Sequence, residues 1–274
     1  MYQAHWNFER RPFEQVTGSD FYYPAEVHQG ALLKLRYTIE NRRGSAILAG
    51  AAGLGKTLLV GELFRQLGGE YTPTIHVVFP QMPAHQLVSF LADELCGPLD
   101  QIDRGSVDLH IRRIRNFLAE NTRNGRHTVV AIDEAQLLEE RESLETVRLL
   151  MNFQTDGQPD LTLLLVGQPQ LLLNVERLGG IEDRLAVKSL LRPLKMDETL
   201  SYVSHRITVA GANHSIFTPD ALEAVHELSL GIPRRINRLC DLALLIGFAE
   251  GRETIEPDHV GSVAEEMVAI VPGE

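Results

Sequence analysis

The string G-A-A-G-L-G-K-T at residues 50–57 is the feature that most limits what this chain can fold into. It matches the phosphate-binding loop pattern G-x-x-x-x-G-K-[S/T] without interruption. A short apolar run typical of a buried strand precedes it at 45–49, and apolar residues recur at helical spacing behind it at 58–67. The alternative, an ordinary glycine-rich turn between a strand and a helix, leaves the Lys-Thr pair unexplained. The sequence therefore predicts a binding site for a nucleoside triphosphate.

Each residue type in this loop suits a phosphate ligand. Glycines let backbone N–H groups close around the phosphates, and the helix start adds free N–H groups and the positive end of a dipole. Lys56 is expected to reach the β- and γ-phosphates, and the Thr57 hydroxyl is expected to ligate Mg²⁺. The predicted nucleotide-binding residues are Gly50, Ala51, Ala52, Gly53, Leu54, Gly55, Lys56 and Thr57.

An acidic pair, Asp133 and Glu134, follows a second apolar run at 128–132. At the carboxyl end of a parallel strand such a pair lies beside the phosphate crevice. Asp133 is predicted to hold Mg²⁺, directly or through water. Glu134 is predicted to polarise the water that attacks the γ-phosphate. Strands often end in polar turns, so the acidic pair alone is weak evidence for a catalytic site. Together with the phosphate loop at 50–57 it becomes strong evidence. Because a module that only binds nucleotide needs no extra carboxylate, the sequence favours ATP hydrolysis.

Composition narrows the function classes further. The chain has 274 residues, enough for one large domain or for a larger and a smaller one. Its net charge of −11 argues against a broad nucleic-acid-binding surface but leaves a local basic patch open. Cys96 and Cys240 are the only cysteines, which suggests neither a disulfide framework nor a zinc site. With no apolar run of about 18 residues and no signal-peptide pattern, we expect a cytoplasmic protein.

Strand-like and helical patterns alternate along the chain as far as Pro193. That alternation predicts an α/β fold, a parallel P-loop sheet covered by helices on both faces. The expected strands are 46–49, 74–79, 128–132 and 161–166, and the expected helices are 25–41, 56–67, 83–96, 106–122 and 140–154. Beyond Pro193 only helical patterns follow, at 197–210, 219–228, 233–249 and 257–269. We expect an N-terminal segment plus nucleotide-binding domain over 1–193 and a small all-helical lid domain over 194–274.

Several further strings make a family resemblance specific. The phosphate loop, the Asp-Glu strand end and the C-terminal helices together resemble an AAA+ ATPase. Over nearly the whole chain, the sequence is similar to the general secretion pathway protein A family, the ATPases associated with type II secretion, and to type IV pilus and transposition-helper ATPases. The strings are R-P-F at 11–13, Y-T-I-E-N-R-R-G at 37–44, V-G-Q-P-Q-L at 166–171, L-K-M-D-E-T at 194–199 and, most discriminating, G-I-P-R-R-I-N-R-L-C-D at 231–241.

The resemblance implies two sensor residues. Gln168 occupies the place of sensor 1, the polar residue after the fourth strand that helps orient the attacking water. Many AAA+ proteins have Asn, Ser or Thr there, and the alternative is that Gln168 only caps a turn before a proline. Arg234 matches sensor 2, which folds back onto the γ-phosphate from the first turn of a lid helix. Arg235 and Arg238 are the alternatives to Arg234.

The resemblance also implies an arginine finger and therefore a homo-oligomer. Arg184 aligns with the position that reaches a neighbouring subunit's nucleotide, where a guanidinium stabilises charge spread over phosphoryl oxygens. A plain surface salt bridge is the alternative interpretation of Arg184, and Arg192 is the next candidate for the finger.

Two departures from the family pattern bear on partners. Longer secretion-pathway members continue into a membrane segment and a peptidoglycan-binding domain, whereas this sequence ends at Glu274. If the chain is complete, we expect it to need a protein partner to act at the envelope, which makes it peripheral at the inner membrane. The stretch T-G-S-D at 17–20 also differs from the turn that is usual there.

Three function classes therefore stay open. The first is an ATPase that assembles or remodels a secretion or pilus complex in the envelope. The second is a DNA-associated ATPase of the transposition-helper type, and the third is a nucleotide-gated switch or scaffold with little turnover. DNA binding would need a positive surface, although such a run of charges is usually a solvated face or a subunit contact. The best candidates for that surface are Arg104, Arg112, Arg113, Arg115, Arg123 and Arg126, opposite the apolar stripe Val107, Ile111, Ile114 and Leu118.

Overall fold

The computed structural model describes residues 2–14, 19–99, 106–138 and 141–269 of the chain. Contacts divide it into two compact units. The sheet unit comprises Val27–Ala52 and Lys56–Leu191, and the helical unit comprises Met1–Glu26, Gly53–Gly55 and Arg192–Glu274.

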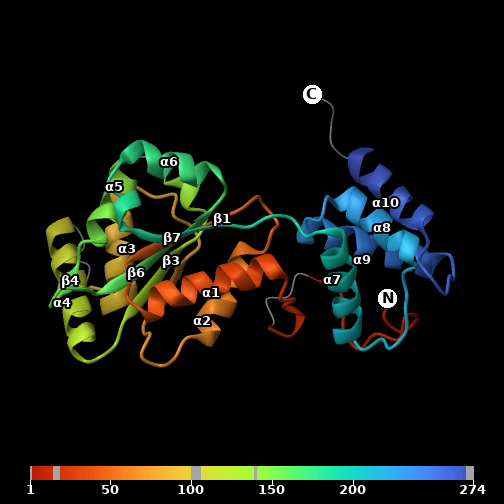
Figure 1. Cartoon of the computed structure of the whole chain (residues 1–274), viewed down its shortest axis with the longest axis horizontal. Coiled ribbons are helices and arrows are strands. Elements are labelled where there is room, and N and C mark those ends of the chain that lie inside the picture. Colours follow the sequence, from red (N-terminus) through yellow and green to blue (C-terminus); the bar gives the residue numbers. More distant parts are fainter. Residues whose placement is uncertain (1, 15–18, 100–105, 139–140, 270–274) are drawn as a thin grey trace. The chain divides into compact units, whose positions relative to one another are not determined.

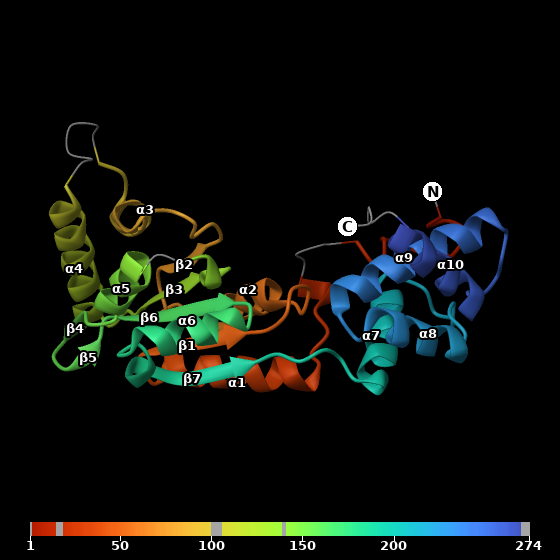
Figure 2. The same ribbon diagram turned by 90° about the horizontal axis from the view of Figure 1, so that it is seen from above.

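The sheet unit is built on five parallel strands in the order β2-β3-β6-β1-β7 (Figures 1 and 2). The strands are β1 (Ser45–Ala49), β2 (Thr74–Val77), β3 (Thr128–Ile132), β6 (Leu161–Gly167) and β7 (Leu185–Leu190). Every residue of β1, β3 and β6 is buried. Central strands covered on both faces read as unbroken apolar runs, which is why three of them were recognisable from sequence.

Helices cover both faces of this sheet. Alternate strand residues such as Ile47, Val130 and Leu163 share one apolar cluster with α3 (Ala84–Cys96), α4 (Val107–Arg123), α5 (Arg141–Leu150) and α6 (Gln170–Leu178). Helices α1 (Glu26–Glu40) and α2 (Lys56–Gln66) lie together on the opposite face (Figure 1). The expected α/β class, a parallel P-loop sheet followed by helices, is confirmed.

Two expected elements differ from those in the structure. The strand expected at 74–79 ends at Val77, because the pairing of β2 with β3 ends there. Val78 and Phe79, which follow it, are each 64% exposed. The helix expected at 140–154 ends at Leu150. A small hairpin follows, with β4 (Gln154–Thr155) antiparallel to β5 (Gln158–Pro159) around Asp156-Gly157. Both turn residues have positive φ, at 51° and 78°, as the Asp-Gly turn of a two-residue hairpin requires.

The helical unit packs four helices on the N-terminal segment. They are α7 (Met196–Val209), α8 (Pro219–Ser229), α9 (Pro233–Ala249) and α10 (Pro257–Ala269). Thr218 caps α8 by accepting a hydrogen bond from the Ala221 amide at 3.2 Å, and Pro219 follows in the first turn. Trp6 lies in the same core, 1% exposed, and its indole N–H donates to the Leu244 carbonyl at 3.1 Å. Residues 2–14 and 19–26 therefore belong to the helical unit, whereas the sequence pattern predicts that they belong with the nucleotide-binding domain.

Among the described residues, no helix is both long enough and apolar enough to cross a lipid bilayer.

Candidate nucleotide site

The residues predicted to bind and hydrolyse nucleotide lie just after the carboxyl ends of three neighbouring strands of the sheet. The phosphate loop follows β1, the acidic pair follows β3, and Gln168 follows β6. Ala49 is paired with Gly167 and Ile132 with Leu165, so the parallel register brings the three carboxyl ends together. Ligands of open parallel sheets bind at this carboxyl edge.

The loop backbone has the conformation that a phosphate cradle needs. Gly53 and Gly55 have φ values of 84° and 87°, which a residue with a Cβ adopts only under strain. Helix α2 begins at Lys56, so the free N–H groups of its first turn face the loop. The Lys56 side chain is 5% exposed, and its Nζ donates to the carbonyls of Gly50 at 2.8 Å and Ala51 at 3.1 Å. The ammonium group is thus held inside the loop.

Thr57 and Asp133 bring two oxygen atoms to one point. The Thr57 Oγ1 donates to Asp133 Oδ2 at 2.6 Å, and the His76 Nε2 lies 3.4 Å from the same oxygen. Burial raises the pKa of Asp133, but the contacts with His76, Thr57 and the Glu134 amide outweigh it and the pKa lies below its usual value. An ionised carboxylate beside a hydroxyl is the donor set that Mg²⁺ prefers, so these residues fit a magnesium ion.

Glu134 sits on an unusual backbone. Its φ is 49°, in the left-handed region that residues other than glycine rarely adopt. Its amide donates to Asp133 Oδ1 at 2.9 Å, which ties the two acidic residues together. The Gln136 Nε2 donates to Glu134 Oε2 at 2.6 Å. Left-handed backbone at a site of this kind is a common place for stored strain.

Gln168 approaches this group through its backbone. The Gln168 N–H donates to Gln136 Oε1 at 2.9 Å, while the Gln168 side chain is exposed. The structure therefore brings Lys56, Thr57, Asp133 and Glu134 together, with Gln168 joined to them through Gln136.

Arg184, the predicted arginine finger, lies in a short 3-10 turn, Glu182–Arg184, just before β7. Its Nε donates to the Gly180 carbonyl at 3.3 Å, and one terminal nitrogen donates to Asn152 Oδ1. The side chain is only partly buried, and both contacts are exposed, so they cost little to break.

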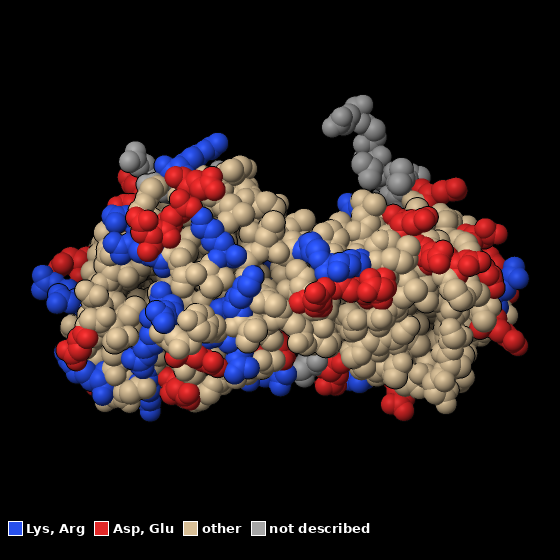
Figure 3. Space-filling model, in the orientation of Figure 1, with Lys and Arg blue, Asp and Glu red and all other residues tan. Residues whose placement is uncertain are grey.

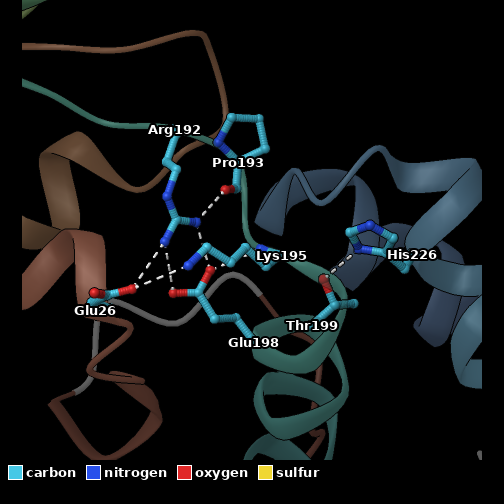
Figure 4. A network of polar contacts seen from close by, with 7 residues as sticks. All are labelled: Glu26, Arg192, Pro193, Lys195, Glu198, Thr199 and His226. Carbon is cyan, nitrogen blue, oxygen red and sulfur yellow. Dashed lines mark hydrogen bonds and ion pairs between the residues drawn. The ribbon is translucent and has the colours of Figure 1, made fainter.

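Arg192, the other candidate for the finger, forms its side-chain contacts with residues of the helical unit (Figure 4). Its terminal nitrogens donate to Glu198 at 2.6 and 3.2 Å, and one lies 3.4 Å from Glu26. The Arg192 hydrogen bond holds the pKa of Glu198 below its usual value. Glu198 also accepts from the Lys195 amide at 2.8 Å, which closes the start of α7. Arg192 thus has a structural role at a helix N-terminus that Arg184 lacks.

Arg234 lies in the first turn of α9, after Pro233, as expected. Arg234, Arg235 and Arg238 are all exposed. They line a pocket of about 540 Å³ in the helical unit, together with Phe13, Glu14, Asn237 and Asp241. Of the three arginines, Arg234 is the one whose backbone N–H donates to the carbonyl of Gly53 in the phosphate loop, at 3.3 Å.

The row of arginines around α4 is partly paired. Arg112 Nε lies 3.0 Å from Asp108, and Arg113 lies 3.2 Å from Asp93. Arg104 lies outside the described residues. On the face that Figure 3 shows, Lys and Arg are interspersed with Asp and Glu over the sheet unit. A mixed surface of this kind is typical of a solvated face.

Sequence reasoning missed two residues of the site, Gln136 and His76. Gln136 is the fourth residue of the string D-E-A-Q, and its distance of two positions from Glu134 was the available signal. His76 lies near the carboxyl end of β2, on the strand beside Asp133. A single sequence does not show that β2 pairs with β3, so it could not place His76 beside Asp133.

The loop, the acidic strand end and the parallel sheet define a P-loop domain of the AAA+ class. A family model for the AAA domain matches residues 39–174. The chain is also 35% identical over 272 residues to general secretion pathway protein A of Aeromonas hydrophila. This match covers 98% of the chain but 49% of the relative, so the chain spans about half of that protein's length. The resemblance inferred from the motifs is confirmed: the chain carries an AAA domain and is a relative of general secretion pathway protein A.

Solved structures share the fold at low sequence identity. The ORC2 protein of Aeropyrum pernix, in its ADPNP–ADP complexes, gives a TM-score of 0.72 at 19% identity, over 94% of this chain and 72% of that one. Cdc6p of Pyrobaculum aerophilum gives 0.72 at 18%, over 93% and 70%. The Walker-type ATPase PABY2304 of Pyrococcus abyssi gives 0.63 at 18%, over 94% and 77%. At these identities the likeness concerns the fold alone.

Proposed function

We propose that this chain is a Mg²⁺-dependent ATPase that hydrolyses ATP to ADP and phosphate. The observation that carries the proposal is the convergence of Lys56, Thr57, Asp133 and Glu134 at one sheet edge, with Thr57 and Asp133 2.6 Å apart. A phosphate loop alone would account for binding. The second carboxylate, one residue beyond the metal-binding one, is the group that hydrolysis needs.

Each residue has a separate task in this proposal. The loop amides and Lys56 bind the β- and γ-phosphates, and Thr57 and Asp133 hold Mg²⁺. The bound ion neutralises phosphate charge. Glu134 accepts a hydrogen bond from a water molecule and orients it toward the γ-phosphate. The remaining residues act around this centre: Gln168 as sensor 1, Arg234 as sensor 2, and Arg184 as a finger donated to a neighbouring copy of the chain in a homo-oligomer.

The cellular role that we propose is the assembly or remodelling of a secretion or pilus complex in the envelope. It rests on the relationship to general secretion pathway protein A. The client would be a protein component of that complex. The chain would act from the cytoplasm, held at the inner membrane by a partner, with residues 194–274 as the lid.

One variant, Glu134→Gln, tests the activity and then finds the client. It should bind ATP as the wild type does and should hydrolyse it roughly 10²- to 10⁴-fold more slowly, the usual contribution of a positioned acid–base group. Phosphate release and calorimetric ATP titration measure the two properties. The same trapped protein, loaded with ATP, should retain envelope-complex components on purification.

The matched control is Glu142→Gln, which changes an exposed carboxylate at the start of α5 and should leave turnover unchanged. Wild-type turnover by Glu134→Gln would remove Glu134 from the mechanism. A wild type that binds ATP, forms oligomers and releases no phosphate would point to a nucleotide-gated switch. Co-purifying DNA, with a steep salt dependence of DNA affinity, would point to a transposition-helper role.

A further inference from the structure

The Gln136 side chain joins the two strand ends on which hydrolysis is proposed to depend. Its Nε2 donates to Glu134 Oε2 at 2.6 Å, and its Oε1 accepts from the Gln168 N–H at 2.9 Å. One amide group therefore connects the acidic residue after β3 with the backbone after β6. Both bonds have good donor–acceptor distances, and both ends of the amide are used.

Three features fix the position of this amide. Gln136 lies in the 3-10 turn Ala135–Leu137 and is 9% exposed. The residue itself is also held through its backbone, because Asn174 of α6 donates from its Nδ2 to the Gln136 backbone carbonyl at 3.5 Å. Gly167, the last residue of β6, leaves room for the side chain. A Cβ at Gly167 would lie 2.5 Å from Gln136 Oε1, closer than such atoms come in proteins.

The amide leaves one oxygen of Glu134 available. Gln136 holds Oε2, and no described residue donates a hydrogen bond to Oε1. A carboxylate on a left-handed backbone needs its side chain fixed by a neighbour if it is to orient a water molecule, because misplacement by about 1 Å costs ~10²-fold in rate.

We propose that Gln136 is a positioning residue for Glu134. It holds the Glu134 carboxylate next to the end of β6, so that Glu134 Oε1 faces the attacking water. The same amide keeps the Gln168 backbone at a fixed position relative to Glu134. The proposal rests on the proposed ATPase function and adds to it a residue that touches neither nucleotide nor water.

Two substitutions at Gln136 test the two hydrogen bonds of its side-chain amide. Gln136→Glu keeps the side-chain length and the acceptor for the Gln168 N–H but cannot donate to Glu134 as an ionised carboxylate. Gln136→Met keeps the length and loses both bonds. Both variants should lower kcat by ~10²-fold and leave the dissociation constant for ATP within about twofold of wild type, since the misplaced group acts only on the water.

Gly167→Ala tests the same contact from the opposite strand. Its methyl group should displace the Gln136 amide and lower kcat in the same way. The double variant Gly167→Ala with Gln136→Met should then be no slower than Gln136→Met alone, because both changes remove one interaction. Gln154→Glu, an exposed residue of the β4–β5 hairpin, is the matched control and should turn over as the wild type does.

Several outcomes would overturn the proposal. They are wild-type kcat in Gln136→Glu, a rise in kcat, a parallel loss of ATP affinity and turnover, and additive effects of the Gly167 and Gln136 changes. Should Gln136→Met fail to fold, Gln136→Glu and Gly167→Ala still decide the question. The failure of the ATPase proposal looks different, because the wild type and the Gln154→Glu control would then bind ATP and release no phosphate.

Discussion

The Thr57 hydroxyl donates a 2.6 Å hydrogen bond to Asp133 Oδ2, although 76 positions separate the two residues in the sequence. Strands β1 and β3 lie on either side of β6 in the parallel sheet, and this arrangement brings the two residues together. Thr57 belongs to the helix after β1, and Asp133 follows the end of β3. The bond places a hydroxyl and an ionised carboxylate where a hard cation needs oxygen ligands. The pairing of the two residues supports the proposed Mg²⁺ dependence of the ATPase.

Asp133→Asn should remove the Mg²⁺ dependence of ATP binding and stop turnover, because an amide oxygen carries no charge to hold the ion. Calorimetric titration of ATP with and without Mg²⁺ measures the effect. Asp108→Asn, on an exposed face of α4, provides the control with the same chemical change. Equal gains in ATP affinity from Mg²⁺ in Asp133→Asn and in wild type would show that the ion is held elsewhere.

Lys56→Ala should abolish ATP binding. The variant removes the ammonium group that the loop carbonyls of Gly50 and Ala51 hold in place, while the β- and γ-phosphates still need neutralising. Equilibrium binding of a fluorescent ATP analogue tests this, with Lys34→Ala on the exposed side of α1 as control. Near-wild-type affinity in Lys56→Ala would refute the phosphate-loop assignment.

Arg184→Ala should bind ATP normally and lose most of its turnover, if Arg184 serves a neighbouring subunit. Activity per subunit should also rise with protein concentration as oligomers form. Mixing Arg184→Ala with Glu134→Gln should restore some activity, because a subunit with intact Glu134 then receives the finger from a partner that keeps Arg184. Lys at 184 should rescue poorly, since it lacks the planar fork of donors.

Arg177→Ala, an exposed arginine on α6, is the control for that experiment. Activity that does not change with concentration, or mixtures no more active than the separate variants, would leave Arg184 as a surface residue bonded to Asn152 and Gly180.

Acid should destabilise the sheet unit through His127. Burial, with a smaller contribution from Arg42, lowers the pKa of His127 from 6.5 to about 4. Between these values the unfolded chain binds a proton there and the folded chain does not, so stability falls as the pH falls below 6.5. Between pH 7.5 and 5 this group should cost the wild type about 2 kcal/mol.

The His127→Gln variant should lack that part of the acid sensitivity, as measured by urea unfolding at the two pH values. The exposed His85→Gln variant should behave as the wild type does. If the wild type and His127→Gln lose equal free energy of unfolding over this range, His127 does not remain neutral in the folded protein.

The central strands and the phosphate loop could be predicted from the sequence, because each has a recognisable pattern of adjacent residues. A strand buried on both faces is mostly apolar, as at 45–49, 128–132 and 161–167, and a phosphate cradle needs glycines followed by Lys-Thr. The edge strand β7 was missed. It alternates between partly buried and exposed residues and includes Lys188, so its pattern does not stand out from a loop.

The sequence by itself therefore determined the class of fold, the phosphate loop and the acidic pair, because each depends on residues adjacent in the chain. Only the tertiary structure decided which distant residues meet. It set β6 between β1 and β3, which brings Gln168 to Gln136, and it packed Trp6 against α9. Such contacts form between surfaces far apart in the sequence, and neither helical period nor strand alternation encodes which surface will cover which.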